Sequence, residues 1–263
     1  MEWLNLAFYK FTEFSDPKGL QERLIAFCRE SCPSMKGTIL VSHEGLNCFV
    51  AVEAAEGEVF IRYLTAIPGL EELFVKRSYS EGKNPYSRML IKLKPEIIPM
   101  GIAEVKPAQK TGRRISPEEL AGWYRENKDF VILDTRNQFE FDLGTFKNAL
   151  SLGLKNFREF PKKLGELPED TRDKPVVMFC TGGIRCEKAT AAAELQGFRD
   201  VYQLDGGILN YFEKVGGENY TGDCFVFDKR VALAPDLKPS GRQACFECRT
   251  VMKDGETRES HRC

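Results

Sequence analysis

The sequence predicts a chain that is α+β in its first part and α/β in its middle part, and three observations lead to this fold class. Residues 1–100 show strand and helix patterns in the order β, α, β, β, α, β, which is the split βαβ arrangement. Residues 117–218 contain near-continuous apolar strands that alternate with helices, as in a parallel sheet covered on both faces. Residues 219–263 are rich in Gly, Pro and charge, which predicts an irregular extension that contains cysteines.

The first domain begins with an aromatic-rich strand and a helix on which Leu24 and Cys28 recur at helical spacing. Residues 43–45 (His-Glu-Gly) separate two β-rich runs, and a short break that contains glycine is typical of a hairpin. The predicted strands are 3–14, 37–42, 46–52, 72–80 and 87–98, and the predicted helices are 18–30 and 54–67. This order predicts a ferredoxin-like, or acylphosphatase-like, domain over residues 1–100.

Residues 101–116 lose the periodic pattern and form the predicted linker. Four cations and no acidic residue occur between Val105 and Ser116: Lys106, Lys110, Arg113 and Arg114. Two interpretations of this basic stretch stay open, a solvated linker and a contact for RNA phosphate.

A helix begins the second domain at Pro117, because Ser116 supplies an N-cap and Glu119 completes a capping box. The following strands are predicted at 130–135, 175–180 and 201–204, and the helices at 156–164, 187–195 and 208–215. Ligands of such parallel sheets bind at the carboxyl ends of the strands. The candidate site is therefore expected at that edge.

Composition and charge exclude several classes of protein. The 263 residues, with 42% hydrophobic and 29% charged residues, are typical of about two globular domains and not of a disordered or coiled-coil chain. No apolar run approaches the roughly 18 residues of a membrane span, so a cytoplasmic protein without a membrane partner is expected. With 38 Lys+Arg against 39 Asp+Glu, a nucleic acid must be held by local patches, and no DNA partner is expected.

The nine cysteines are an odd number in a chain without a secretion signal, which favours reduced thiols over a disulfide framework. One of them is distinguished by its neighbours. Cys180 closes an apolar strand, and the loop Thr181, Gly182, Gly183, Ile184, Arg185 leads directly into a helix. Glycines allow backbone N–H groups to converge on the sulfur, and the helix start and the arginine add positive charge. Such surroundings lower a cysteine pKa into the range of roughly 3.5 to 7.5, so a thiolate is expected.

The loop resembles that of the rhodanese family, in which a Cys-x-x-x-x-Arg loop carries a persulfide on its cysteine. Two further segments resemble that family in the same order, 131–136 with the following Phe139, and 204–208. Related phosphatases have one more residue between cysteine and arginine, so the spacing from Cys180 to Arg185 favours sulfur chemistry. Residues 144–149 (Gly-Thr-Phe-Lys-Asn-Ala) depart from the usual rhodanese motif and favour a specialised branch.

That branch resembles the oxygen-dependent tRNA uridine 5-hydroxylases. The resemblance spans nearly the whole chain and rests on four segments: 43–47 (His-Glu-Gly-Leu-Asn), 157–161 (Phe-Arg-Glu-Phe-Pro), the Cys180 loop, and 224–228 (Cys-Phe-Val-Phe-Asp). It implies hydroxylation of the wobble uridine in the tRNA anticodon region, molecular oxygen as co-substrate and an unidentified electron donor. Nothing in the composition or periodicity indicates hydroxylation.

Several residues have two interpretations. Asp134 and Arg136 are expected to form a structural ion pair at the base of the loop. Arg185 either supports the loop or pairs with Glu187, and Cys186 either resolves an oxidised Cys180 or packs inward. His43 and Glu44 either face RNA or only form a polar hairpin turn.

The cysteines near the C-terminus, Cys245, Cys248 and Cys263, supply the first three positions of a zinc ribbon. A fourth cysteine is missing and His261 is too close to Cys263 to be an easy ligand. The open alternatives are a structural zinc site and a tail with spare thiols. Two histidines in the whole chain argue against a two-histidine iron oxygenase, and no nucleotide-binding glycine motif occurs.

Three functions follow in order of preference. The first is hydroxylation of a tRNA wobble uridine, with anticodon bases stacked on aromatic residues such as Phe8, Tyr9 or Tyr86. A place for these aromatic residues in the core is an equal alternative. The second is a sulfurtransferase that carries a persulfide on Cys180. The third is a non-catalytic adaptor for RNA or protein.

Overall fold

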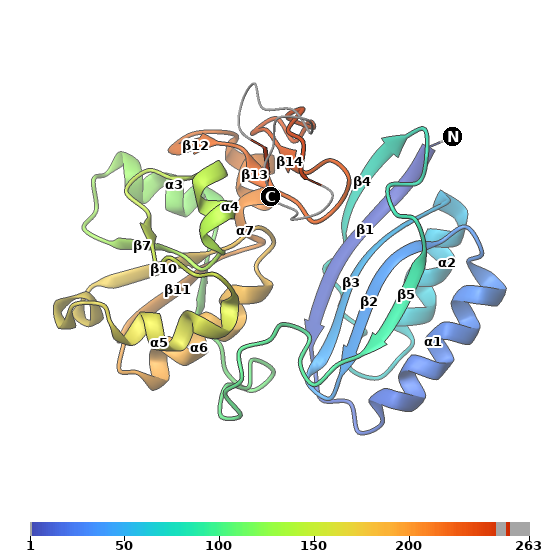
Figure 1. Cartoon of the computed structure of the whole chain (residues 1–263). Helices are drawn as coiled ribbons and strands as arrows, with labels where there is room; N and C mark the ends of the chain where they lie inside the picture. The colour runs from blue at the N-terminus through green and yellow to red at the C-terminus, as the bar shows by residue number, and fades with distance from the viewer. Residues whose placement is uncertain (1, 246–250, 253–263) are drawn as a thin grey trace. The chain divides into compact units, whose positions relative to one another are not determined.

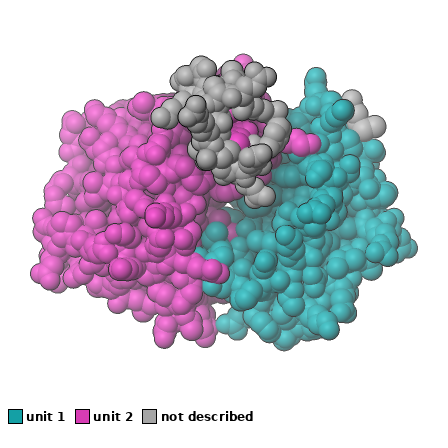
Figure 2. Space-filling view, viewed as in Figure 1, with its two compact units in different colours: residues 1–99 teal, residues 100–263 magenta. Residues whose placement is uncertain are grey.

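The structure is a computed structural model that describes residues 2–245 and 251–252. The chain forms two compact units, Met1–Pro99 and Met100–Cys263 (Figure 2). Among the described residues, none of the helices combines the length and the apolar character that a membrane crossing requires.

The first unit is a five-stranded sheet in the order β4-β1-β3-β2-β5 with two helices (Figure 1). Its elements are β1 (Glu2–Phe11), α1 (Pro17–Ser31), β2 (Lys36–Ser42), β3 (Gly45–Val52), α2 (Ala54–Thr65), β4 (Lys76–Glu81) and β5 (Met89–Leu93). The pairs β1–β3, β1–β4 and β2–β3 are antiparallel. This arrangement confirms the predicted ferredoxin-like order, and β5 adds a strand parallel to β2 at the free edge.

The alternation of β1 explains the core of this unit. Leu4, Leu6 and Phe8 are buried on one face of the strand, where the helices α1 and α2 cover the sheet. The Phe8 ring lies near that of Phe60, with centroids 6.5 Å apart. Phe8 is therefore a core residue, and the expectation that it stacks on RNA bases is wrong.

The second unit contains a parallel sheet in the order β6-β11-β10-β7-β9. Figure 1 shows α5 and α6 on one side of this sheet and α3 and α7 on the other, as the apolar strands predict. The elements are β6 (Arg113–Ile115), α3 (Pro117–Arg125), β7 (Val131–Asp134), α4 (Gln138–Leu143), β8 (Gly144–Phe146), β9 (Leu150–Ser151), η1 (Phe157–Glu159), α5 (Phe160–Gly165), η2 (Glu169–Asp173), β10 (Pro175–Phe179), α6 (Ile184–Leu195), β11 (Asp200–Leu204), α7 (Gly207–Val215), β12 (Tyr220–Gly222), β13 (Cys224–Phe225) and β14 (Ala232–Leu233).

The N-terminus of α3 has the predicted cap. The Ser116 hydroxyl oxygen accepts a hydrogen bond from the N–H of Glu119 at 3.1 Å, and Pro117 is the first helical residue. The capping chemistry of the sequence therefore places this helix start correctly.

The basic stretch before this helix is not a free surface. Arg113 and Arg114 lie in β6, which pairs with β11, so the sheet begins inside the segment expected to be a linker. Three cations of this stretch form ion pairs with carboxylates of the same unit. Lys110 pairs with Glu194, Arg113 with Asp200, and Arg114 with both Glu187 and Asp205. These pairs favour a structural role over a contact with RNA phosphate.

The described part of the C-terminal extension packs on the second unit. β12 pairs antiparallel with β8, and β13 pairs antiparallel with β14. Cys224, the first residue of β13, is fully buried. The extension thus brings β13 close to the loops at the carboxyl end of the parallel sheet.

Candidate active site

Cys180 lies at the carboxyl end of β10, where residues 180–183 lead into α6. The N–H of Gly183 donates a hydrogen bond to the Cys180 Sγ at 3.1 Å. Gly183 has a φ of +102°, in the left-handed region that glycine enters without a side-chain clash. The loop therefore curls around its own sulfur, as the glycine pair predicts.

The loop also lowers the pKa of the Cys180 thiol. Burial by itself raises the pKa of the Cys180 thiol, because it disfavours the charged form. A hydrogen bond from the Cys186 thiol, the charge of Arg185 and the N–H groups of Arg185 and Gly183 outweigh burial and lower the pKa to about 5. At neutral pH the sulfur is a thiolate, the form expected from the loop sequence.

Cys180 is only 1% exposed, yet its surroundings are polar. Arg185, Glu140 and Thr181 lie around the loop and are linked to one another by hydrogen bonds. Because Cys180 is so little exposed, a substrate atom reaches the sulfur only when neighbouring groups move aside. The site is therefore closed in this state, and a charged sulfur is held inside it by peptide and guanidinium donors.

Arg185 pairs with Glu140, not with Glu187. Its Nη1 donates to Glu140 Oε2 at 2.6 Å and its Nη2 donates to Oε1 at 2.8 Å, and both side chains are buried. Burial alone raises the pKa of the Glu140 carboxyl, but Arg185 and the nearby Arg136 hold it below its usual value. Glu187 instead accepts from Arg114 at 2.6 Å. Arg185 is thus fixed beside the loop by a partner from α4.

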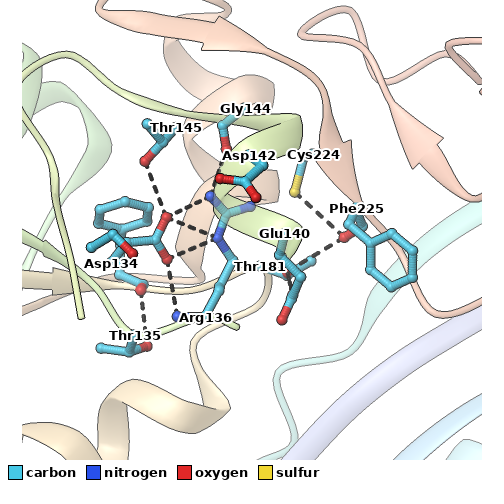
Figure 3. Close-up of polar contacts among 12 residues, drawn as sticks. Asp134, Thr135, Arg136, Glu140, Asp142, Gly144, Thr145, Thr181, Cys224 and Phe225 are labelled. Carbon is cyan, nitrogen blue, oxygen red and sulfur yellow. Dashed lines mark hydrogen bonds and ion pairs between the residues drawn. The ribbon is translucent and has the colours of Figure 1, made fainter. Parts of the chain in front are cut away.

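The base of the site contains the expected pair of Asp134 and Arg136 (Figure 3). Arg136 Nη2 donates to Asp134 Oδ2 at 2.6 Å and to the carbonyl of Gly144 at the same distance. The Thr145 hydroxyl donates to Asp134 Oδ2 at 3.0 Å. The pair links the end of β7 to β8, and thereby positions α4, which carries Glu140.

The back of the Cys180 loop rests on the start of α7. The N–H of Ile208 donates to the Cys180 carbonyl at 2.9 Å, and the N–H of Leu209 donates to the Thr181 carbonyl at 3.1 Å. Gly207 allows this approach, because a Cβ at that position would lie 2.4 Å from the Cys180 carbonyl oxygen. The loops after β10 and β11 therefore hold each other in shape.

Cys186 lies in the first turn of α6 and is fully buried. Burial and the neighbouring Cys180 keep the pKa of the Cys186 thiol well above its ordinary value, so it stays protonated and donates to the Cys180 sulfur. The Thr135 hydroxyl lies 3.8 Å from the Cys186 Sγ on the other side. The structure thus places Cys186 inward and in contact with Cys180. A role of Cys186 in resolving an oxidised Cys180 stays a prediction.

Thr181 connects the loop to the C-terminal extension. Its hydroxyl donates to the Phe225 carbonyl at 3.4 Å, and Cys224 lies beside it (Figure 3). Burial raises the pKa of the Cys224 thiol to about 12, so this neighbour is neutral. The sequence identifies Cys224 and Phe225 only through the family resemblance, and no spacing signal links them to Cys180.

Other candidate residues lie elsewhere or outside the described part. In the first unit, the His43 Nδ1 lies 3.1 Å from the Phe14 carbonyl oxygen and Glu44 accepts from the Ile97 N–H at 2.8 Å, contacts that stabilise the hairpin. Cys245 is half-buried, while Cys248 and Cys263 lie outside the described residues. Within residues 2–245 and 251–252, no group of His, Cys, Asp and Glu is arranged to hold a metal ion. Zinc binding by the three cysteines stays a prediction.

This arrangement suits chemistry at sulfur. A thiolate is both a nucleophile and a site for a further sulfur or oxygen atom, and a fixed guanidinium stabilises the charge it releases or regains. The loop holds the anion with few residues, and Cys180 is 1% exposed in this structure.

Comparison with known proteins agrees with this geometry. The family model of the UPF0176 acylphosphatase-like domain matches residues 3–97, and that of the rhodanese-like domain matches residues 116–214. Proteins called tRNA uridine(34) hydroxylase from Cupriavidus necator and from Acaryochloris marina are both 41% identical over 99% of this chain, which spans 93% and 83% of their lengths. The protein of that name from Paraburkholderia phytofirmans is 43% identical over 96% of this chain and 90% of its own. Two matching domain models and these full-length similarities show that the chain belongs to the tRNA uridine(34) hydroxylase family.

Proposed function

We propose that this chain uses molecular oxygen to convert the wobble uridine of tRNA to 5-hydroxyuridine, with the Cys180 thiolate as the reacting group. The names of the relatives support the reaction and the substrate. The observation that carries the role of Cys180 is the hydrogen bond from the Gly183 N–H to its sulfur, in a loop that lowers its pKa to about 5.

The thiolate is suited to addition at C6 of the uracil ring. This addition leaves an electron pair on C5, the carbon that gains one oxygen atom from molecular oxygen. Loss of the C5 proton and expulsion of the sulfur then restore the double bond. The second oxygen atom leaves as water, which requires two electrons and two protons from a donor that the sequence does not identify.

The residues around the sulfur have separate parts in this reaction. Arg185 stabilises the thiolate before addition and after its expulsion, and Glu140 holds Arg185 in place. Cys186 supplies a hydrogen bond to the sulfur. The buried position of Cys180 excludes water from the reacting atoms once the base is bound.

The test is nucleoside analysis of tRNA from a strain that lacks the gene and carries a plasmid copy. We expect wild type to restore 5-hydroxyuridine and Cys180→Ala to restore none. Cys32→Ala is the matched control, because Cys32 is equally buried, at 1% exposure, but lies in the first unit. Normal 5-hydroxyuridine in the Cys180→Ala strain would refute the assignment.

Sulfur transfer is the second candidate, because the match to the rhodanese-like domain and a thiolate in a short loop also suit a persulfide. The two functions differ in what purified protein does with thiosulfate. A sulfurtransferase gains the mass of one sulfur atom on the Cys180 peptide and turns over when cyanide is added. We expect neither the gain of a sulfur atom nor turnover with cyanide as a catalytic activity of this chain.

The remaining expectations concern partners and cofactors. The proposed substrate is the anticodon region of tRNA, and the cytoplasmic location predicted from the sequence suits it. Molecular oxygen enters as a co-substrate, so 5-hydroxyuridine is expected to fall in cells grown without oxygen. Zinc at Cys245, Cys248 and Cys263 would serve stability, and its measurement in purified protein by metal analysis tests that prediction.

A further inference from the structure

Three phenylalanines form a continuous row beside the Cys180 loop. The rings of Phe139 and Phe225 have centroids 5.1 Å apart and planes at 88°, and those of Phe225 and Phe227 are 5.0 Å apart at 90°. Phe139 is 36% exposed and Phe227 is 59% exposed, whereas the other aromatic clusters of this unit lie largely in its core. A contiguous patch of large apolar side chains at a surface is a feature that marks binding sites, whereas single exposed apolar residues are ordinary.

This row, which we call the aromatic ledge, is joined to the active-site loop. Its central residue, Phe225, accepts a hydrogen bond through its carbonyl from Thr181, the residue that follows Cys180. Figure 3 shows the ring of Phe225 on the side away from the ion pair of Asp134 and Arg136. Phe139 precedes Glu140, the partner of Arg185. The ledge therefore adjoins both the Cys180 loop and the pair of Arg185 and Glu140.

Positive charge lies near the same edge. The N–H of Gln138, next to Phe139, donates to the carbonyl of Leu154 at 2.8 Å, which fixes the segment after Leu154 beside α4. Lys155 and Arg158 in that segment are exposed, and within the described residues neither has an ion-pair partner. This differs from the basic stretch around Arg114, in which Lys110, Arg113 and Arg114 pair with carboxylates of their own unit.

We propose that Phe139, Phe225 and Phe227 form a stacking surface for the unpaired bases that flank the target uridine, and that Lys155 and Arg158 contact the adjoining phosphates. Bases of single-stranded loops stack on exposed aromatic rings, and the phosphates between them require cations. The inference rests on the proposed function and assigns the RNA contact to a surface of the rhodanese-like unit. The aromatic ledge then has the stacking role that the sequence predicted for Phe8, which is buried.

An aromatic surface with two unpaired cations favours RNA over an apolar protein partner. A protein interface of this kind would bury the rings among aliphatic groups and would have no need of phosphate-binding charges. RNA uses both features together. The two occupants also respond differently to substitution: an aliphatic side chain replaces phenylalanine in an apolar contact but not in base stacking.

The experiment measures the dissociation constant of the full chain for a fluorescently labelled anticodon stem-loop RNA. We expect Phe227→Ala and Phe139→Ala each to weaken binding about tenfold, within the range for loss of one stacked base. Phe227→Tyr should bind as wild type, and Phe227→Leu should bind as weakly as Phe227→Ala. Phe74→Ala is the matched control, because Phe74 is 67% exposed but lies in the first unit.

The charges are tested by the salt dependence of the same binding. Lys155→Gln and Arg158→Gln should each reduce the slope of log K against log salt by about 0.7, the change for one phosphate contact on a single strand. Wild-type affinity in both Phe227→Ala and Phe139→Ala would overturn the inference. Wild-type affinity in Phe227→Leu would overturn stacking and indicate an apolar contact.

Failure of the ledge and failure of the proposed function remain distinguishable. If the plasmid copy restores 5-hydroxyuridine and all ledge variants bind RNA normally, only the ledge is refuted. If wild type binds the stem-loop and the ledge variants bind it weakly, but no 5-hydroxyuridine forms, the ledge stands and the reaction is wrong.

Discussion

Arg185 and Glu140 form a buried bidentate ion pair, with an Nη1–Oε2 distance of 2.6 Å and an Nη2–Oε1 distance of 2.8 Å. The arginine comes from α6 and the glutamate from α4, so the pair joins the loops that follow β10 and β7. One arginine therefore serves two negative groups, the carboxylate of Glu140 and the thiolate of Cys180. Its charge favours the ionised form of the sulfur.

Removal of this cation should make the sulfur harder to ionise. We expect Arg185→Met to raise the pKa of Cys180 from about 5 toward the ordinary value of about 8.5, because burial then acts with less opposition. Arg185→Lys, which keeps the charge, should raise it less. The measurement is the rate of iodoacetamide labelling of the Cys180 peptide as a function of pH, by mass spectrometry. An unchanged labelling profile in Arg185→Met would show that the guanidinium does not set the ionisation.

Ionisation of Cys180 should also make the stability of the fold depend on pH. The folded-state pKa of about 5 lies below the value of about 8.5 in an unfolded chain, so the thiolate stabilises the fold. That contribution is complete above about pH 8.5 and is lost as the pH falls toward 5. We expect the difference in unfolding free energy between wild type and Cys180→Ser to increase from pH 5 to pH 8.5, as measured by urea denaturation. A difference that is constant over this range would contradict a depressed pKa.

The ion pair of Asp134 and Arg136 should be a strong contributor to stability when one partner is removed. Both side chains are almost completely inaccessible to solvent, and Asp134→Asn leaves the charge of Arg136 buried without its carboxylate. We expect a loss of about 3–5 kcal/mol in the free energy of unfolding. Asp129→Asn is the matched control, because Asp129 is exposed and pairs with Lys174 at the surface. That substitution should change stability by less than about 1 kcal/mol, so equal effects of the two would be inconsistent with the buried pair.

A side chain at position 207 should deform the Cys180 loop. In Gly207→Ala the new Cβ would meet the Cys180 carbonyl oxygen at 2.4 Å, so the loop or the start of α7 must shift. We expect at least a tenfold loss of 5-hydroxyuridine formation, since small displacements of a reacting group cost about that much or more. Gly197→Ala separates this clash from backbone strain, because Gly197 also has a positive φ but no atom within 4 Å of the added Cβ. Similar activity in the two variants would show that contact with the loop is unimportant.

The sequence predicts the elements whose patterns are local. The apolar runs of β7 and β10, the cap at Ser116 and the hairpin at Gly45 each depend on residues close together in the chain. The Cys180 loop belongs to the same class, because its glycines and arginine are adjacent in sequence. These features therefore need no knowledge of the tertiary fold.

The parts that the sequence does not predict depend on contacts between distant segments. Arg185 pairs with Glu140, which comes 45 residues earlier in the chain, and not with the neighbouring Glu187. Only the position of α4 in the folded chain identifies this partner. The strand β6 escapes prediction because it is short and contains two arginines, which are typical of a linker. Phe225 and Phe227 belong to a segment whose sequence has no clear periodicity, so the contact of Phe225 with Phe139 is seen only in the folded chain.

The concealment of the Cys180 sulfur gives the protein a way to discriminate between whole tRNA and small uracil compounds. A free nucleoside would make only a small contact with the protein, and Cys180 is 1% exposed. A folded RNA loop, which binds over a wider area, can supply the energy for opening this site. The cell's pool of uridine and its nucleotides would then be left untouched, although each of them carries the same reactive ring.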